Sequence, residues 1–208
     1  MDHNIIDLMN QFYSDRIRIS EAVSIVKDEA TIISPDTRRQ NRVPPGQRVT
    51  NGLPTLHYGG VPKIDTSQWR FRIFGQVETE RNLSFDEFMA LSKVRVLSDV
   101  HCVTGWSRLD NLWEGVSTSV LKDLVKIKPE ANFALIHAYG GFSTNLSQED
   151  FFQEDVLFAI KHDGIIITPD HGYPVRLVVP RLYFWKSNDN LPEELIPCEG
   201  HGAVHGRS

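Results

Sequence analysis

The 208-residue sequence predicts a domain in which β-strands prevail over a few short helices. Residues 69–77 (WRFRIFGQV) alternate apolar and polar side chains, which is the pattern of a strand with one buried face. Residues 133–144 and 155–168 each contain two apolar runs separated by glycine, which predicts two strands joined by a turn. These segments cover much of the chain, so sheet is expected to dominate.

Local signals predict the remaining elements. Residues 83–91 contain Ser84 at the start of a short helical segment, and serine is a typical N-cap. Residues 94–100 (VRVLSDV) predict another strand, and residues 116–127 have helical spacing that stops before a proline. Residues 176–180 (RLVVP) predict a buried strand that ends at proline.

Both ends of the chain depart from this pattern. Residues 1–30 have partly helical periodicity and predict a peripheral arm. Residues 31–62 are rich in proline, glycine and arginine, which favours an extended segment wrapped over a surface. After Lys186 no apolar period is sustained and turn formers are frequent, so a poorly ordered tail is expected.

Charge and apolar content exclude several classes of protein. The net charge of −5 argues against nucleic acid as the main partner, because binding the phosphate backbone needs a basic face. No run approaches the roughly 18 apolar residues of a membrane span. The first residues lack the basic start and apolar centre of a signal peptide. We therefore expect a cytoplasmic protein that inserts into no membrane.

Cys102 is the first candidate for chemistry. A cysteine after an apolar, strand-like run is most often a small buried hydrophobic residue. Its neighbours Thr104, Gly105 and Trp106 favour a second interpretation, a thiolate at the floor of a pocket, which suits transition metals. The other cysteine, Cys198, is distant and outside any C-x-x-C pair, so a disulfide scaffold is not expected.

A second group of candidates consists of an arginine, a tyrosine and three histidines. Arg176 opens the apolar strand, where it forms either an ion pair with a carboxylate or a fork on a ligand phosphate. His171, five residues earlier, is either solvated or faces the same ligand. His57 and Tyr58 adjoin paired glycines, which let backbone N–H groups approach a ligand. His137 in a strand-like run is either a core histidine or a ligand-facing one.

One further pattern carries little weight. Cys198, His201 and His205 have a spacing seen among zinc ligands, but neither a fourth ligand nor a folded frame is evident around them. We do not expect a structural zinc ion there.

Several of these motifs together resemble a known family. HCVTGWS, WEGV, DHGYPVRLVVP and LYFWKS, in this order, resemble the molybdopterin-binding domain of the sulfite oxidase family. RVPPGQ and LHYGGVP narrow the resemblance to small soluble sulfite-oxidase-like oxidoreductases of bacteria and archaea. The resemblance implies a β-rich α+β fold, the sulfite oxidase molybdopterin-binding fold, over residues 42–187. Residues 1–41 would then form an N-terminal arm and residues 188–208 a divergent, disordered tail.

The resemblance also implies a cofactor, Mo-molybdopterin, whose dithiolene holds molybdenum together with a protein cysteine. Cys102 matches that cysteine, as metal ligand and catalytic residue. His57 and Tyr58 match the loop that contacts the pterin, and His137 falls near a pocket-lining position. His101, next to the ligand cysteine, is expected to tune the thiolate through indirect contacts.

The remaining matches concern the anchoring of the cofactor. His171 and Arg176 match a pair that contacts the pterin and its phosphate. Lys186 and Ser187 open the last anchoring loop. Thr104, like His101, is expected to tune the thiolate from its neighbouring position.

Three departures from the family pattern bear on substrate and cofactor. The sulfite-oxidising members have an arginine in the loop that corresponds to Leu56–Tyr58 and a tyrosine where this chain has Ile160. Losing that arginine removes a charge-assisted contact to a dianion worth about 1.5–3 kcal/mol, so sulfite is not the expected substrate. Asp189 stands near the position of a lysine that grips the cofactor phosphate, and a carboxylate there repels phosphate.

The sequence thus predicts a molybdopterin-dependent oxidoreductase that catalyses two-electron redox or oxygen-atom transfer on a small molecule. The chain has no haem-attachment or ferredoxin-type cysteine motif, so an external electron-transfer partner is expected. A monomer is expected, since the length leaves no room for the dimerisation domain of larger members. Two alternatives stay open. One is a non-catalytic member with weakened or lost cofactor binding, and the other is a cysteine hydrolase with His137 or His171 as base.

Overall fold

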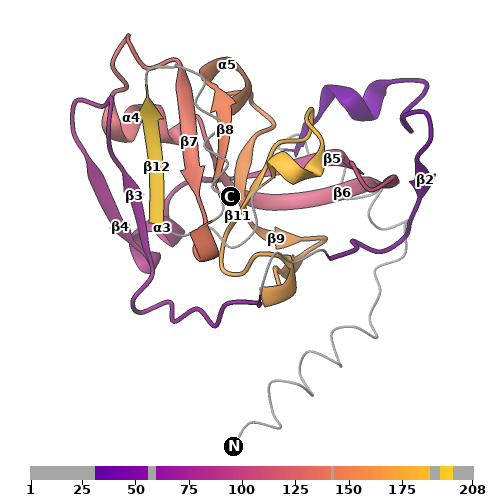
Figure 1. The fold of residues 1–208 in the computed structure, drawn as a ribbon, viewed down its shortest axis with the longest axis horizontal. Helices are drawn as coiled ribbons and strands as arrows, with labels where there is room; N and C mark the ends of the chain where they lie inside the picture. The colour runs from indigo at the N-terminus through magenta and orange to yellow at the C-terminus, as the bar shows by residue number, and fades with distance from the viewer. Residues whose placement is uncertain (1–30, 56–59, 142, 188–192, 199–208) are drawn as a thin grey trace, which may run out of the picture. The chain divides into compact units, whose positions relative to one another are not determined.

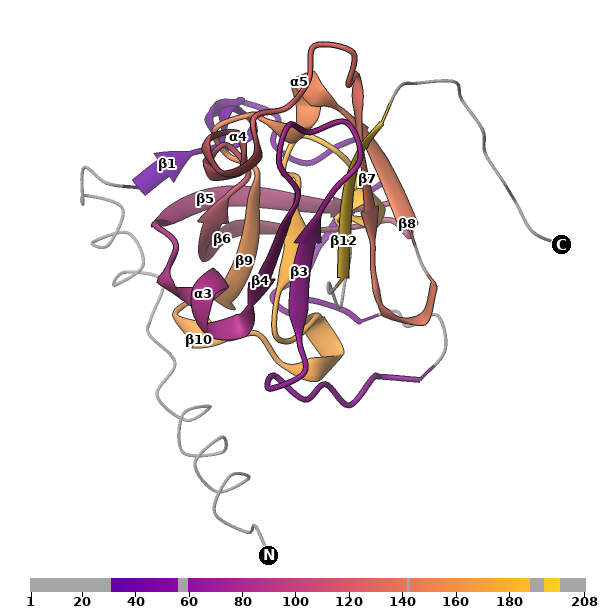
Figure 2. The same ribbon diagram turned by 90° about the vertical axis from the view of Figure 1, so that its left-hand side faces the viewer.

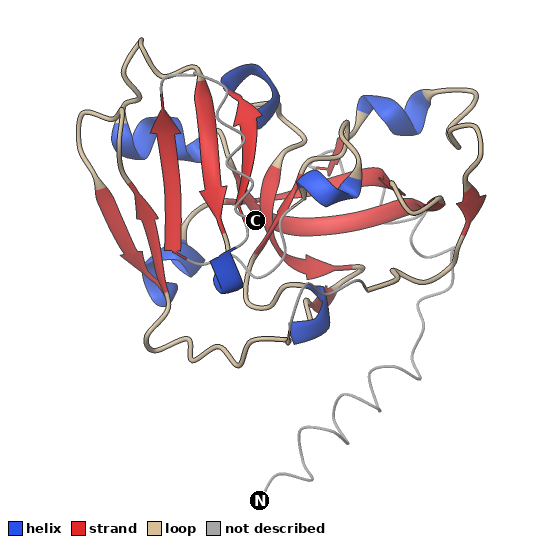
Figure 3. Ribbon diagram, in the orientation of Figure 1, coloured by secondary structure: helices blue, strands red, loops and turns tan. Residues whose placement is uncertain are grey.

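Two β-sheets and several short helices make up the computed structural model of this chain (Figure 1, Figure 3). The structure describes residues 31–55, 60–141, 143–187 and 193–198. Contacts divide the chain into two units, residues 1–31 and residues 32–208. The predicted helical arm over residues 1–30 lies outside the described residues.

The larger sheet has seven strands in the order β1-β5-β6-β9-β10, with β2 paired to β6 and β11 paired to β9. The longest pair is the β5–β6 hairpin, which is antiparallel, whereas β2 runs parallel to β6. The strands of this sheet are β1 (Thr31–Ile33), β2 (Arg48–Val49), β5 (Lys93–Cys102), β6 (Trp106–Ser117), β9 (Leu157–His162), β10 (Ile165–Ile166) and β11 (Arg176–Val178).

The smaller sheet has five strands in the order β4-β3-β12-β7-β8. In two perpendicular views, β5 and β6 run across the strands of this sheet (Figure 1, Figure 2). Its strands are β3 (Arg70–Ile73), β4 (Arg81–Ser84), β7 (Phe133–His137), β8 (Ser143–Ser147) and β12 (Glu193–Cys198).

The helices are all short and connect the strands. The α-helices are α3 (Phe85–Ala90), α4 (Val120–Val125) and α5 (Gln148–Phe151). The 3-10 helices are η1 (Pro35–Arg38), η2 (Tyr139–Gly141), η3 (Pro169–His171) and η4 (Phe184–Lys186). The helical segment predicted over residues 116–127 is shorter in the structure, because the buried strand β6 extends through its first residues before α4 begins.

Local sequence accounts for several of these elements. The arginines of β3 are exposed, whereas Phe71 and Ile73 are buried, as the alternation of the sequence predicts. Helix α3 starts with a capping box, because the Ser84 hydroxyl accepts from the Glu87 N–H while the Glu87 carboxylate accepts from the Ser84 N–H. The predicted N-cap is confirmed.

The buried apolar side chains form two clusters. The larger cluster contains residues of both sheets and of all three α-helices, including Phe71, Phe88, Leu121, Phe151 and Phe158. The smaller cluster contains residues of the seven-stranded sheet and adjoining loops. Its members are Val96, Val100, Cys102, Trp106, Trp113, Leu157, Ala159, Ile167 and Val178. Strand β9 is buried on both faces, since alternate residues belong to different clusters.

Strand β12 corrects the expectation of a tail without structure from residue 188 onwards. Glu193–Cys198 pairs antiparallel with β7 and, over its first residues, parallel with β3, so it lies inside the five-stranded sheet. Pro197 lies beyond the part paired with β3, where its missing N–H breaks no ladder on that side. The two neighbouring strands supply the hydrogen-bond partners, so this strand forms although its own sequence has no strong strand pattern.

A close approach between β6 and β9 depends on Gly115. A Cβ atom built at this position would lie 2.1 Å from the carbonyl oxygen of Phe158, so no larger residue fits there. Gly115 pairs with Ala159, and Ala159 pairs in turn with Arg176 on β11. Three adjacent strands are thus aligned through one row of residues, of which the first two are small.

Candidate functional site

A tight hairpin turn carries Cys102 at the end of β5. Cys102 pairs with Trp106, and the Gly105 N–H donates to the Cys102 carbonyl over 3.0 Å. Gly105 has a φ of +86°, the left-handed conformation that completes a three-residue hairpin loop and that glycine adopts without strain. The turn therefore fixes the backbone on both sides of the cysteine.

A β-bulge precedes this turn and is held by a buried carboxylate. The register of the β5–β6 pair shifts between Ser98 and Val100, which leaves Asp99 fully buried. Arg42 donates to both carboxylate oxygens of Asp99, over 2.8 Å and 2.6 Å, and the backbone N–H of Asp110 adds a third hydrogen bond. Arg42 also donates to the Asp110 carboxylate. The carboxylates of Asp99 and Asp110 together raise the pKa of Arg42, so its guanidinium stays charged.

The Cys102 side chain points into the smaller cluster and is 8% exposed. The Thr104 hydroxyl lies 3.2 Å from Sγ and donates a hydrogen bond to it. The thiol is therefore a buried group with one polar neighbour. The apolar cluster agrees with a buried hydrophobic cysteine, and the hydroxyl donor agrees with a thiolate site, so features of both interpretations are present.

A hydrogen-bonded chain lies on the other face of the hairpin. His101 Nδ1 is 2.8 Å from the Ser107 hydroxyl, which donates to Gln47 Oε1 over 2.6 Å. Gln47 Nε2 in turn donates to the Cys102 carbonyl over 3.0 Å. Because the Ser107 hydrogen is used on Gln47, His101 donates from Nδ1. Burial lowers the pKa of His101, which favours the neutral ring.

Residues 47–53, which we call the strap, run along this hairpin (Figure 1). The backbone N–H groups of Arg48 and Thr50 donate to the carbonyls of Gly105 and Ser107, over 3.1 Å and 2.8 Å. The Arg108 guanidinium donates to the Asn51 carbonyl over 3.3 Å. The predicted extended segment is thus tied to the turn that carries Cys102. The strap leads toward His57 and Tyr58, which lie outside the described residues.

His171 holds the end of the strap. Its Nε2 donates to the Leu53 carbonyl over 2.9 Å, and its Nδ1 accepts from the Thr168 hydroxyl over 2.8 Å. Both ring nitrogens are thus used within the chain, and the solvated histidine considered from the sequence is not what the structure shows. A contact between His171 and the pterin stays a prediction.

Arg176 is a charged group in the interior, 1% exposed. Its guanidinium donates to the His171 carbonyl over 2.7 Å and to the Ser187 carbonyl over 3.4 Å. The guanidinium carbon lies 4.2 Å from the ring centroid of Phe184 and 5.8 Å from that of Trp113. The structure therefore brings three predicted site residues, His171, Arg176 and Ser187, into one place.

Helix η4 connects the surroundings of Arg176 to the five-stranded sheet. Lys186 donates to the main-chain carbonyl and the side-chain oxygen of Asn145 on β8, both over 3.1 Å. The Ser187 hydroxyl accepts from the Val179 N–H over 3.0 Å and is buried. The predicted anchoring loop is thus fixed to both sheets by its own polar groups.

His137 occupies the last position of β7 and is half-buried. Its Nε2 atom is buried and has no hydrogen-bond partner among the residues that the structure describes. A buried ring nitrogen without a partner fits the ligand-facing interpretation better than that of a satisfied core histidine.

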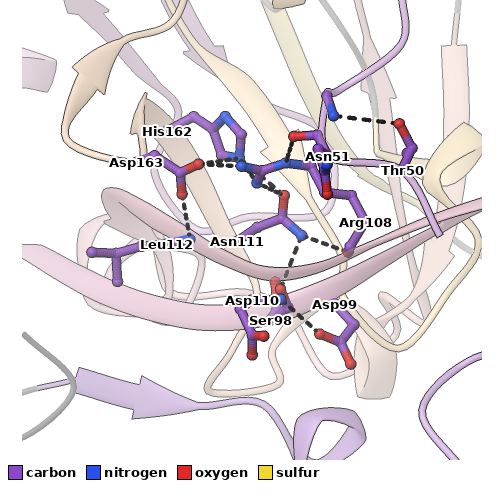
Figure 4. Close-up of polar contacts among 11 residues, drawn as sticks. Thr50, Asn51, Ser98, Asp99, Arg108, Asp110, Asn111, Leu112, His162 and Asp163 are labelled. Carbon is purple, nitrogen blue, oxygen red and sulfur yellow. Dashed lines mark hydrogen bonds and ion pairs between the residues drawn. The ribbon is translucent and has the colours of Figure 1, made fainter. Parts of the chain in front are cut away.

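A polar cluster on β6 and the β9–β10 turn was not expected from the sequence (Figure 4). The Arg108 guanidinium contacts the side chains of Asn111, His162 and Asp163, over 2.9 Å in the case of His162 Nε2. Asp163 also accepts from the Leu112 N–H over 3.0 Å. Arg108 and His162 are 54 positions apart, so no local pattern announces the contact.

His162 contacts both a donor and an acceptor in this cluster. Its Nε2 lies 2.9 Å from the Arg108 guanidinium, which can only donate, and 3.0 Å from Asn111 Oδ1, which can only accept. Burial, with the neighbouring arginine adding to it, holds the pKa of His162 well below its usual value, although Asp163 acts in the opposite direction. The ring packs on Trp113 with 4.2 Å between centroids, which connects the cluster to the apolar surroundings of Cys102.

These groups fit a metal that arrives with its own ligands. Among the described residues, no set of three or more His, Cys, Asp or Glu side chains is arranged to hold a metal ion. The chain instead offers one thiol at Cys102 and one interior cation at Arg176. A soft sulfur ligand suits a transition metal, and a buried guanidinium suits an anionic group of the same cofactor.

Residues 58–191 match the family model described as oxidoreductase molybdopterin binding domain. The chain belongs to this family. Its cofactor is Mo-molybdopterin, and the recognition of the family from the sequence is confirmed. The matched range contains the predicted site residues from Tyr58 to Ser187.

An uncharacterized oxidoreductase of Bacillus subtilis, YuiH, is 44% identical over 150 residues, which cover 72% of this chain and 76% of that protein. The NADH nitrate reductase of Lotus japonicus is 25% identical over 70% of this chain and 21% of its own length. Family membership therefore extends to proteins of which this molybdopterin-binding domain is a small part.

The crystal structure of the sulfane dehydrogenase SoxCD from Paracoccus pantotrophus matches with a TM-score of 0.61 and 20% identity. The match covers 68% of this chain and 41% of that one. The predicted β-rich α+β fold of the molybdopterin-binding type is confirmed. None of the helices in the described residues is long and apolar enough to cross a membrane.

Proposed function

We propose that this oxidoreductase catalyses a two-electron reaction on a small molecule at a molybdenum atom bound by Cys102. The observation that carries the proposal is the isolated thiol at the end of β5, in a site where the described residues form no metal cage of their own. When bound, the cofactor supplies the two-electron redox chemistry. On binding the metal, the Cys102 thiol would lose its proton, and the resulting thiolate would complete the sulfur ligands of the metal.

The other residues would hold the cofactor and shape its surroundings. Arg176 would neutralise the phosphate of the pterin, because its guanidinium is already oriented by the carbonyls of His171 and Ser187. His137 would turn its Nε2, which has no hydrogen-bond partner among the described residues, toward the cofactor pocket. Lys186 would approach the phosphate from the loop that it fixes to β8.

His57 and Tyr58 would complete the pocket on the pterin side, as the family motif implies. They directly follow the strap in sequence, and the strap is tied to the Cys102 turn and, through Leu53, to His171. One continuous segment of the chain, the strap, would thus connect the turn of the metal ligand Cys102 to the loop that contacts the pterin. The chain would act as a monomer in the cytoplasm.

The reaction we infer either adds one oxygen atom to a small sulfur or nitrogen oxide and removes two electrons from it, or removes the oxygen atom and supplies two electrons, with two protons released or taken up as water is consumed or formed. Water would supply or receive the oxygen, and an external redox partner would take up or supply the two electrons. Sulfite is not the favoured substrate, because Ile160 is a buried core residue where sulfite-oxidising members have a tyrosine. Arg176 lies inside the fold as an anchor rather than as a substrate-binding arginine.

A cysteine hydrolase is not favoured. That activity needs a thiol and a histidine within hydrogen-bond reach. Among the described residues, the hydrogen bond to Cys102 Sγ comes from Thr104, while the ring nitrogens of His171 are used on Leu53 and Thr168.

Replacing the thiol tests the proposal directly. Cys102→Ser should lose most of the molybdenum of the purified protein, measured by elemental analysis, together with its redox activity. Serine is a hard, weakly acidic ligand that replaces a soft thiolate poorly. Cys198→Ser, which removes the other cysteine, is the matched control and should keep the metal.

Two outcomes would decide between the alternatives. Full molybdenum content and activity in Cys102→Ser would reject the ligand assignment. Purified unmutated protein that contains neither molybdenum nor the fluorescence of oxidised pterin, after expression in cells that make the cofactor, would support the non-catalytic alternative.

A further inference from the structure

The hydrogen bond from Thr104 to the sulfur of Cys102 is a contact with consequences for a metal bound there. Thr104 lies in the three-residue turn between β5 and β6, and its hydroxyl donates to Sγ over 3.2 Å. It is the only hydrogen-bond donor to this sulfur among the described residues.

The two neighbours expected to tune the thiolate behave differently. His101 precedes Cys102 on the strand and faces the opposite side, where its ring contacts Ser107 rather than the sulfur. Thr104 follows the cysteine by two positions across the turn and reaches Sγ directly. The alternation of the strand therefore assigns the direct contact to Thr104 alone.

The surrounding backbone fixes the main chain of the turn that carries this exposed threonine. Gly105 closes the turn with its N–H on the Cys102 carbonyl, and the Gly105 carbonyl accepts from the Arg48 N–H of the strap. Gln47 donates to the same Cys102 carbonyl. These bonds hold the main chain on both sides of Thr104, and the Thr104 hydroxyl reaches the sulfur from that position.

We propose that Thr104 is a positioning residue that sets the electron-donating strength of the Cys102 sulfur and thereby the reduction potential of the metal. The inference rests on the proposed function, in which this sulfur binds molybdenum. A hydrogen bond donated to a metal-bound thiolate withdraws electron density from the sulfur, which stabilises the reduced, electron-richer metal. The hydroxyl therefore raises the midpoint potential relative to a site without it.

The test compares variants of the cofactor-loaded protein at one fixed pH. Thr104→Val keeps the shape of the side chain and removes the hydroxyl. Its molybdenum should titrate at a lower midpoint potential, followed by optical absorption or electron paramagnetic resonance, with the molybdenum content unchanged. The sulfur-to-molybdenum absorption band should shift as well, because the band depends on the energy of the sulfur electrons.

Two further variants separate a tuning role from a structural one. Thr104→Ser keeps the hydroxyl and should restore the midpoint potential and absorption band of the unmutated protein. Thr50→Val removes a hydroxyl that bonds to the Gly52 N–H and not to the sulfur, so its potential should equal that of the unmutated protein.

The outcomes distinguish failure of this inference from failure of the proposed function. If Cys102→Ser loses its molybdenum while Thr104→Val leaves potential and band unchanged, the sulfur is a ligand and the inference about Thr104 is overturned. If Cys102→Ser keeps its molybdenum with an unchanged spectrum and potential, the proposed ligand itself is wrong and the inference falls with it. A lower potential in Thr104→Val that Thr104→Ser restores supports the inference.

Discussion

The two apolar clusters of this oxidoreductase have different surroundings. The larger one packs the two sheets together with aromatic side chains, such as Phe71 and Phe158, whose ring centroids are 4.9 Å apart. The smaller one contains Cys102 and has buried polar groups at its border, among them Arg176 and Asn111. The comparison teaches that the main aromatic core and the proposed site of chemistry lie in different parts of one fold.

The difference follows from the cost of burying polar groups. An interior cation or carboxylate is tolerated only with hydrogen-bond partners, so the region around Cys102 needs many specific contacts for each group that it buries. The larger cluster gains most of its free energy from apolar area, and a buried polar group at its border, the Thr118 hydroxyl, donates to the carbonyls of Phe151 and Val156. Substitutions in the two regions should therefore fail in different ways.

The largest effect is expected in the larger cluster. Phe158→Ala removes a fully buried ring that contacts Phe71, Phe88 and Phe151, and should lower the free energy of unfolding by about 3–5 kcal/mol. Urea denaturation measures the loss. The fraction that remains folded should still bind molybdenum, since the site lies in the other cluster.

Phe152→Ala is the matched control, because the neighbouring ring is only partly buried and its loss should cost less. A Phe158→Ala protein as stable as the unmutated one would show that the larger cluster is not where the stability lies. The comparison between the two regions would then fail.

A smaller effect on stability, with a specific effect on the metal, is expected at the turn. Gly105→Ala places a side chain at φ +86°, which should cost about 1–2 kcal/mol of unfolding free energy. Since the turn positions Cys102 and Thr104, the molybdenum content should fall as well. Urea denaturation and elemental analysis measure the two changes on the same preparation.

Gly52→Ala provides the control for this change. Gly52 does not have a positive φ and has open space around its Cβ position, so alanine should alter neither quantity there. Should Gly105→Ala lose stability yet keep all of its metal, the geometry of the turn would matter only for folding.

The smallest effect is a change in pH dependence at the border of the smaller cluster. The pKa of His162 lies below its ordinary value of 6.5 in the folded protein, so the unfolded chain binds more protons just below that pH. His162 therefore contributes stability above pH 6.5 that is lost as the pH falls toward the folded pKa. The slope contributed is at most about 1.4 kcal/mol per pH unit.

His162→Gln keeps an acceptor for Arg108 and removes the titrating ring. The unfolding free energy, measured by urea denaturation between about pH 6.5 and 5, should then vary less steeply with pH than in the unmutated protein. Part of the slope should remain, because burial lowers the pKa of His101 in the same direction. An unchanged slope in His162→Gln would show that His162 is not the group that titrates.

Sequence patterns predicted those parts of the molecule that depend on near neighbours. The capping box at Ser84, the glycine turn between β9 and β10, and the burial of the strand at Arg176 all follow from residues a few positions apart. Cys102 at a strand end was visible for the same reason. The family resemblance added the cofactor, which no local pattern specifies.

The rest depends on contacts between distant parts of the chain. Gln47 and Ser107 are 60 positions apart, and the strand β12 exists because β7 and β3 offer it partners. The ring nitrogens of His171 could not be assigned either, since one of them bonds to Leu53 118 positions away. Such pairings become apparent only when the sheet order is known.

The row formed by Gly115, Ala159 and Arg176 has one more consequence. Since any Cβ at position 115 would collide with the carbonyl of Phe158, the absence of a side chain sets how closely β9 approaches β6. Strand β11 pairs with β9, so the spacing between β9 and β6 also affects the distance from Arg176 to β6, the strand that follows the Cys102 turn. Gly115, which has no side chain, therefore helps to set the spacing of the strands around the proposed cofactor site.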